Sequence, residues 1–177
     1  MNGMDFRSIS VLVIDDNSNM RKILGAMLKS FGVRDIREAD DGLHALRVLN
    51  GREVDIIFTD LMMQPVDGLA FIRWIRTSTA SPCPFAPIVM MTGHATQRSL
   101  MEARMAGVTE FLAKPLTAHG VLHRLNEVIN NPRPFVRVND YFGPCRRRRI
   151  DHEFVGEERR GLDETSDHPQ FDPEDVY

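Results

Sequence analysis

The stretch VDIIFTD at residues 54–60 decides the fold class. Apart from Asp55, its first six residues are apolar or β-branched, which predicts a short strand buried on both faces. Asp60 ends this run and stands just past the strand. A second run of the same kind, ISVLVI at residues 9–14, is followed at once by Asp15 and Asp16. Runs of this type are typical of parallel sheets that are covered by helices.

Strand and helix patterns alternate along the chain on either side of this stretch. Apolar residues at helical spacing follow each of five predicted strands, at residues 9–14, 35–39, 54–59, 88–91 and 109–112. Five strands that alternate with five helices predict a doubly wound α/β fold, with a five-stranded, mostly parallel sheet between two layers of helices. Residues 81–87 contain three prolines, which predict an irregular segment before the fourth strand.

Side chains that could do chemistry follow four of the five predicted strands: Asp15 and Asp16, Asp60, Thr92, and Lys114. Right-handed crossovers bring the C-terminal ends of parallel strands to one edge of the sheet, where ligands of such sheets bind. Three carboxylates at that edge favour Mg²⁺ or a shared proton. A lysine ammonium and a threonine hydroxyl suit phosphoryl oxygens. The set therefore predicts a site that forms an aspartyl phosphate.

Four motifs make the sequence similar to the receiver domains of CheY-like response regulators: VLVIDDNSNMRKIL, DIIFTDLMMQPVDG, IVMMTGHA and FLAKPL, in this order. The resemblance covers roughly residues 7–130, and it implies the flavodoxin-like strand order 2-1-3-4-5. It also implies a protein of a two-component phosphorelay, which accepts a phosphoryl group and then changes its affinity for a downstream protein target. Such a protein is a phosphoacceptor that assists its own phosphorylation and dephosphorylation, rather than an enzyme.

By this resemblance Asp60 is the phosphoacceptor, and it attacks a phosphohistidine on a sensor histidine kinase or a phosphotransfer protein. The resemblance also implies an Mg²⁺ site. Asp16 and Asp60 would ligate the ion directly together with the backbone carbonyl of Met62, and Asp15 would act through a water molecule.

The remaining site residues also come from the resemblance. Lys114 would pair first with Asp60 and then with the phosphoryl group, and Thr92 would bond a phosphoryl oxygen and draw its loop inward. Phe111 stands at the position of an aromatic switch residue that rotates inward behind Thr92. The bond between Lys114 and Pro115 is expected to be cis, and the output surface is expected at roughly residues 93–116.

Three loop positions depart from the usual family pattern or carry unusual side chains. Gln64 stands where the family usually has proline, and Pro65 follows it, so the loop after Asp60 is expected to differ in shape. Met62 and His94 occupy positions that in the family influence access of the hydrolytic water. They are expected to tune self-dephosphorylation in a direction that the sequence does not fix.

The charge of the chain divides it into three segments. Residues 1–130 carry 14 basic and 14 acidic side chains and are the expected receiver domain. Residues 131–149 carry six arginines and one aspartate, and residues 150–177 carry two arginines and ten acidic side chains. The last 47 residues are too few, and too poor in large apolar groups, for a second core. We therefore expect a largely irregular tail, disordered over its acidic part, and no DNA-binding domain.

The basic segment resembles the arginine-rich extension of CheY-like effectors that bind cyclic di-GMP at the flagellar motor. Arginine forks can bind phosphates and read guanine edges, and aromatic faces stack on bases. Cys145 stands where those tails often have aspartate. Alternatives are a segment that docks on an acidic protein, an autoinhibitory contact with the chain's own acidic segment, or no defined role. The candidate nucleotide ligands are Arg133, Arg137, Tyr141, Arg146, Arg147 and Arg148.

Several other classes of protein do not fit the sequence. No apolar run approaches the roughly 20 residues of a membrane span, and the N-terminus lacks the pattern of an export signal. Cys83 and Cys145 form no metal-binding or redox motif, so both are expected to be free thiols. These features predict a cytoplasmic protein without membrane insertion. Its expected partners are the phosphodonor protein and one downstream target, with the flagellar switch as one candidate.

Overall fold

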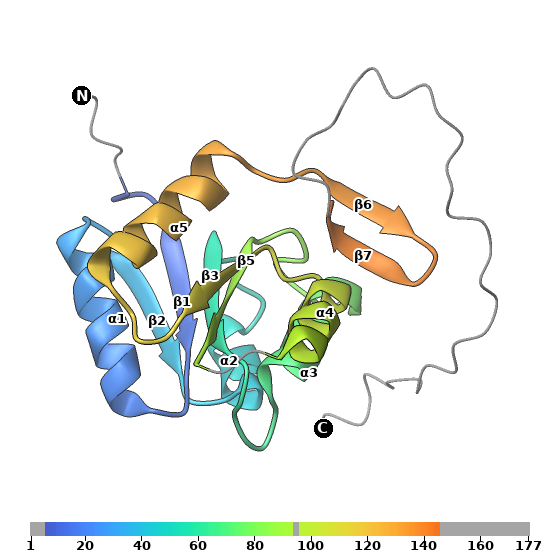
Figure 1. The fold of residues 1–177 in the computed structure, drawn as a ribbon, viewed down its shortest axis with the longest axis horizontal. Coiled ribbons are helices and arrows are strands. Elements are labelled where there is room, and N and C mark those ends of the chain that lie inside the picture. Colours follow the sequence, from blue (N-terminus) through green and yellow to red (C-terminus); the bar gives the residue numbers. More distant parts are fainter. Residues whose placement is uncertain (1–5, 94–95, 146–177) are drawn as a thin grey trace.

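The computed structural model describes residues 6–93 and 96–145. These residues form five strands that alternate with five helices, followed by two further strands (Figure 1). In chain order the elements are β1 Ser10–Ile14, α1 Ser18–Ser30, β2 Asp35–Ala39, α2 Gly42–Leu49, β3 Ile56–Asp60, α3 Gly68–Thr77, β4 Ile88–Thr92, α4 Gln97–Ala106, β5 Glu110–Ala113, α5 Ala118–Asn130, β6 Phe135–Val138 and β7 Tyr141–Pro144.

The first five strands form one parallel sheet in the order β2-β1-β3-β4-β5, which confirms the predicted fold class and strand order. The central strands β1, β3 and β4 are buried along almost their whole length, as apolar runs between two helical layers require. Every strand therefore points its C-terminal end to the same edge, which is the lower edge in Figure 1.

Two apolar clusters hold the helices to the two faces of the sheet. Leu24 and Leu28 of α1 and Leu125 of α5 pack with Phe58 on one face. The opposite face is covered by α2, α3 and α4, where Phe71 is fully buried. Each helix begins directly after a loop at the C-terminal edge, and the side chains that accept hydrogen bonds at their N-caps are Asn17, Asp41, Asp67, Thr96 and Thr117.

The first part of the tail is not irregular, which corrects the expectation for residues 131–145. Strands β6 and β7 form an antiparallel hairpin whose turn places Asn139 in the left-handed region, at φ 51°. The physical reason is an Asn-Asp turn between two short stretches that each carry a phenylalanine, Phe135 and Phe142, which pack on Phe85. The arginine run at residues 146–149 and the acidic segment at residues 150–177 lie outside the described residues.

The hairpin packs against the body of the domain through aromatic rings and one arginine. Phe135 and Phe142 lie with their ring centroids 5.3 and 5.2 Å from that of Phe85, which belongs to the proline-rich segment. The guanidinium of Arg76 in α3 lies 5.0 Å from the centroid of the Phe135 ring and is almost fully buried. Its nitrogens donate hydrogen bonds to the carbonyls of Gly107 and Pro84, at 2.7 to 3.1 Å. Residues 81–87 contain no helix or strand, as predicted, and they serve as a platform for the hairpin.

A close backbone approach sets the position of β7. A Cβ atom built on Gly143 would lie 3.0 Å from the Cα of Gly107, and Gly107 itself has φ 101°. Both positions therefore require glycine, one for space and one for its left-handed backbone. The hairpin thus belongs to the same folded unit as the five-stranded sheet.

Candidate phosphoacceptor site

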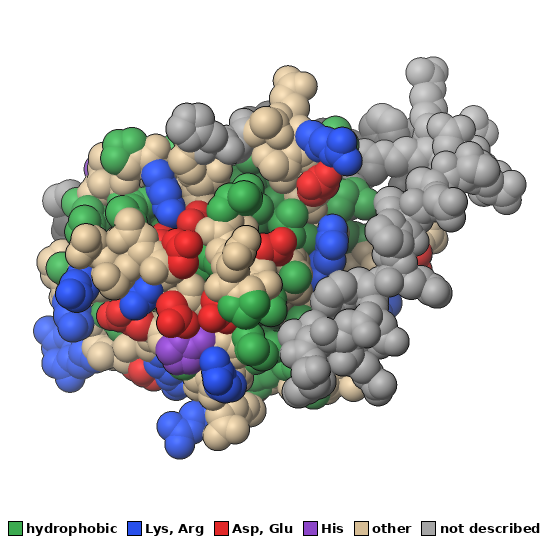
Figure 2. Space-filling view, turned by 90° about the horizontal axis from the view of Figure 1, so that it is seen from below, with side chains coloured by type: hydrophobic (Ala, Val, Ile, Leu, Met, Phe, Trp, Pro, Cys, Tyr) green, Lys and Arg blue, Asp and Glu red, His purple; other side chains and the backbone are tan. Residues whose placement is uncertain are grey.

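The five chemically competent residues predicted from the sequence lie at one edge of the sheet. Asp15 and Asp16 follow β1, Asp60 ends β3, Thr92 ends β4, and Lys114 follows β5. Figure 2 faces this edge from below, and acidic side chains gather near the centre of that surface. The parallel topology alone brings these residues together, because each strand ends within the same layer.

The three carboxylates form a compact group of graded exposure. Asp15, Asp16 and Asp60 each offer an oxygen atom, and these atoms lie within 4.8 Å of one another. Asp15 is fully buried, Asp16 is exposed and Asp60 is intermediate. Like charges at this separation repel one another, so a cation between them lowers the electrostatic energy.

Lys114 supplies one such cation. Its Nζ lies 2.8 Å from Oδ2 of Asp15 and 3.0 Å from Oδ2 of Asp60. The bond between Lys114 and Pro115 is cis, as predicted, and it turns the chain directly after β5. A second cis bond joins Gln64 and Pro65, in the loop that departs from the family pattern.

Backbone amides hold the other oxygen of two of these carboxylates. Oδ1 of Asp15 accepts a hydrogen bond from the N–H of Asn17 at 2.9 Å, and Oδ1 of Asp60 accepts one from Leu61 at 2.8 Å. Both oxygens of Asp15 are thus engaged by the protein, whereas the side chain of Asp16 is exposed. This difference favours Asp16 over Asp15 as a direct metal ligand.

The site shifts the pKa values of its central pair. Burial raises the pKa of Asp60 above its ordinary value, although the hydrogen bond and the charge of Lys114 act in the opposite direction. Burial alone would lower the pKa of Lys114, but its hydrogen bonds to Asp15 and Asp60 outweigh burial and raise it. At neutral pH the lysine therefore stays charged.

Thr92 carries a hydroxyl that the described part of the protein leaves unsatisfied. Its Oγ1 is buried and has no hydrogen-bond partner among these residues. Buried hydroxyls are usually hydrogen-bonded, and an orphaned one at a candidate site indicates a missing ligand atom. The hydroxyl follows β4, beside the strand that ends on Asp60, so a phosphoryl oxygen on Asp60 is the natural partner.

The donor atoms of the acidic cluster are of the kind that Mg²⁺ prefers. Its donors are hard carboxylate oxygens, one of them exposed, and their charge exceeds that of the one lysine between them. Met62 follows two residues after Asp60 with a side chain that is 74% exposed. The predicted role of its backbone carbonyl as a metal ligand stays a prediction.

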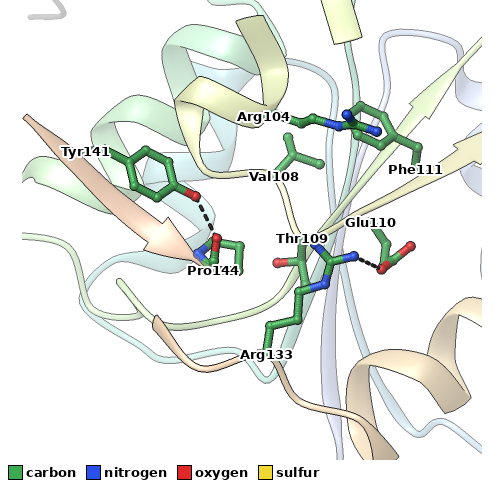
Figure 3. A pocket seen from close by; sticks show the side chains of 8 residues that line it. All are labelled: Arg104, Val108, Thr109, Glu110, Phe111, Arg133, Tyr141 and Pro144. Carbon is green, nitrogen blue, oxygen red and sulfur yellow. Dashed lines mark hydrogen bonds and ion pairs between the residues drawn. The ribbon is translucent and has the colours of Figure 1, made fainter. Parts of the chain in front are cut away.

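Phe111 lies at some remove from the carboxylates, on the α4 side of β5. Its ring is half-buried with the guanidinium of Arg104 5.9 Å from the ring centroid, and its carbonyl accepts a hydrogen bond from Arg124 at 2.8 Å. Figure 3 shows the Arg104 side chain beside this ring, and both residues line a cavity of about 300 Å³. The predicted rotation of Phe111 stays a prediction.

The candidate nucleotide ligands in the described part of the tail are engaged within the domain. Arg133 pairs with the buried carboxylate of Glu110 at 2.7 Å, as Figure 3 shows. Arg137 lies over the ring of Phe142 at 4.6 Å, and the hydroxyl of Tyr141 donates to the carbonyl of Pro144. These contacts serve the hairpin and do not favour a nucleotide. Arg146, Arg147 and Arg148 lie outside the described residues.

Sequence reasoning missed one residue that contacts the backbone of the acidic loop. The Nη1 atom of Arg21 in α1 donates a 2.6 Å hydrogen bond to the carbonyl of Asp15. Its contact with a backbone atom gives no pattern in the sequence.

A parallel doubly wound domain with three carboxylates, a threonine and a lysine at one sheet edge defines a class of phosphoacceptor signalling domain. The chain belongs to the response regulator receiver domain family, whose model matches residues 11–126. It is 32% identical to chemotaxis protein CheY-3 of Vibrio cholerae over 122 residues, which are 69% of this chain and 92% of that protein. It is 31% identical to chemotaxis protein CheY of Pseudomonas aeruginosa over 131 residues, 74% of this chain and 99% of that protein.

Solved structures agree with this assignment. Chemotaxis response regulator CheY4 of Vibrio cholerae superposes with a TM-score of 0.62 at 27% identity, over 68% of this chain and 98% of that one. A response regulator from Chloroflexus aurantiacus shares the fold with a TM-score of 0.63 at 22% identity, over 70% of this chain and 98% of that one. None of the helices within residues 6–93 and 96–145 has the length and apolar character of a membrane span.

Proposed function

We propose that this receiver domain accepts a phosphoryl group on Asp60. A carboxylate oxygen of Asp60 attacks the phosphorus of a phosphohistidine, the phosphorus–nitrogen bond breaks, and the histidine nitrogen leaves with the electron pair. The observation that carries the proposal is the position of Asp60, which ends β3 between Lys114 and two further carboxylates. Hydrogen bonds at both of its oxygens hold it for in-line attack.

Asp16 and Asp60 would hold Mg²⁺ together with the carbonyl of Met62, and Asp15 would contact it through water. When bound, the ion neutralises charge on the phosphoryl oxygens. Asp15 orients Lys114, since its buried carboxylate fixes the ammonium 2.8 Å away. Lys114 stands 3.0 Å from Asp60 and can turn to a phosphoryl oxygen after the transfer.

Thr92 would bind the phosphoryl group and couple its arrival to a change in the neighbouring loop. Its unsatisfied hydroxyl can donate to a phosphoryl oxygen, and this new bond would draw the start of the β4–α4 loop toward the site. A change at this loop would alter the surface of α4 and β5 and so the affinity for a target protein. Phe111 on β5 would take part in that change.

Partner and process follow from the similar proteins rather than from the site. Receiver domains work with histidine kinases or phosphotransfer proteins and with downstream targets, and the relatives at 31% and 32% identity are named chemotaxis proteins. We propose a role in motility, with a component of the flagellar switch as the target. The two free thiols suit a reducing compartment, so we place the protein in the cytoplasm.

Incubation with a small phosphodonor and Mg²⁺ tests the proposal. Wild-type protein should gain the mass of one phosphoryl group, and Asp60→Asn should gain none. Asp67→Asn is the matched control, because Asp67 caps α3 at the same edge and asparagine caps equally well. Failure of the wild type to gain a phosphoryl group, or equal gain by Asp60→Asn, would sink the proposal.

A further inference from the structure

Arg21 contacts the acidic loop at its backbone carbonyls. Its Nη1 lies 2.6 Å from the carbonyl of Asp15 and 3.5 Å from that of Asp16. Its Nε lies 3.5 Å from a carboxylate oxygen of Glu38 on β2. The side chain of Arg21 is only 18% exposed. One guanidinium thus ties α1 and β2 to the backbone that carries both acids.

In these contacts Arg21 bonds the backbone and leaves the carboxylate groups of Asp15 and Asp16 available to a cation. An arginine paired with the carboxylates themselves would compete with a bound cation, as Lys114 does. Arg21 instead bonds the peptide carbonyls, and this fixes the peptide planes from which the side chains of Asp15 and Asp16 project. Without such a restraint, repulsion among three carboxylates would turn the loop outward.

We propose that Arg21 is a positioning residue that sets the Mg²⁺ affinity of the acidic cluster. The inference rests on the proposed function, because it concerns the same site. Residues that orient metal ligands without touching the metal typically contribute between 10- and 100-fold to metal affinity, so we expect about a tenfold loss when Arg21 is replaced.

Electrostatics alone predicts the opposite sign. Arg21 places a positive charge beside a site for a cation, and that charge repels the ion. If the residue acted only through its charge, its removal would strengthen Mg²⁺ binding. If it acts by holding the backbone, its removal weakens binding although a repulsive charge is lost. The direction of the change therefore separates the two roles.

The decisive measurement is Mg²⁺ binding to the full-length protein by calorimetry, with the metal alone as the ligand. Arg21→Gln and Arg21→Lys should each bind about tenfold more weakly than wild type, because a lysine keeps the charge but cannot reach two carbonyls and Glu38 together. Lys22→Gln is the matched control. It removes the same charge one residue further along α1, from an exposed side chain, and should leave the affinity unchanged or slightly higher.

Two further readouts separate positioning from general damage. Circular dichroism should show folded variants, with Arg21→Lys retained as the milder change if Arg21→Gln unfolds. The rate of phosphorylation at saturating Mg²⁺ should return to that of wild type, which a damaged domain would not show. Mg²⁺ binding by Arg21→Gln and Arg21→Lys that equals or exceeds that of wild type overturns the role of Arg21. A wild type that binds no Mg²⁺ overturns the proposed site itself.

Discussion

At the scale of single residues, the site is built from groups that are individually unfavourable. Burial raises the pKa of half-buried Asp60 and so disfavours its charged form, and the hydroxyl of Thr92 is buried without a partner among the described residues. Such costs persist only where other contacts fix the geometry, here Lys114 and the amide of Leu61. Replacing Asp60 by a neutral residue, or Thr92 by an apolar one, should therefore stabilise the fold.

Replacing Thr92 by valine tests the unsatisfied hydroxyl. Because the valine keeps the shape and removes an orphaned polar atom, the free energy of unfolding without Mg²⁺ should stay level or rise by about 1 kcal/mol. Binding of the phosphoryl mimic beryllofluoride with Mg²⁺ should weaken. Thr59→Val is the control, since the hydroxyl of Thr59 already donates to the carbonyl of Asp60 and its loss should destabilise. A Thr92→Val protein clearly less stable than wild type would contradict this account.

The raised pKa of Asp60 gives a pH dependence with a definite sign. A carboxyl whose pKa is higher in the folded protein lowers stability as pH rises from the unfolded value through the folded one. Asp60→Asn lacks this cost, so in metal-free buffer its stability advantage over wild type should grow from acid to neutral pH. Denaturant titrations at several pH values measure the difference. An advantage that shrank as pH rose would show that Lys114, and not burial, dominates.

At the scale of elements, much of the fold was readable because strand and cap signals are local. The apolar runs, the caps Asp67 and Thr117, and the Lys114–Pro115 turn all act within a few residues. The hairpin was missed because its covered face exists only once Phe85 and Arg76 supply a platform. Arg21 was missed for a similar reason, since its partner is a backbone carbonyl.

Removal of the hairpin tests whether it is part of the domain. Protein ending at residue 130 would lose the pair of Arg133 with buried Glu110 and would uncover Arg76 beside Phe85. Its free energy of unfolding should fall by about 3 kcal/mol relative to protein ending at residue 145, because buried Glu110 loses its close ion pair with Arg133 and retains the longer one with Arg124, at 3.7 Å. Thermal and denaturant unfolding measure the change. Equal stability of the two proteins would show that the hairpin only rests on the surface.

At the scale of the whole molecule, the folded unit extends further along the sequence than the match to the family model. The family model covers residues 11–126, whereas the folded unit continues through β7 to Pro144. The neutral segment ends at residue 130, and the hairpin lies within the basic segment of residues 131–149, ahead of the acidic residues 150–177. We therefore expect the chemistry of phosphate to depend on a few residues at one sheet edge, whereas the hairpin packs against α3 and α4.

The central claim is that one carboxylate, Asp60, carries the phosphoryl group. The most direct measurement is reductive trapping of the phosphorylated wild-type protein with borohydride, followed by peptide mapping by mass spectrometry. The account predicts a modified residue at position 60 and unmodified aspartates at positions 15 and 16. A modification at either of those residues, or at any other side chain with position 60 unmodified, would contradict it.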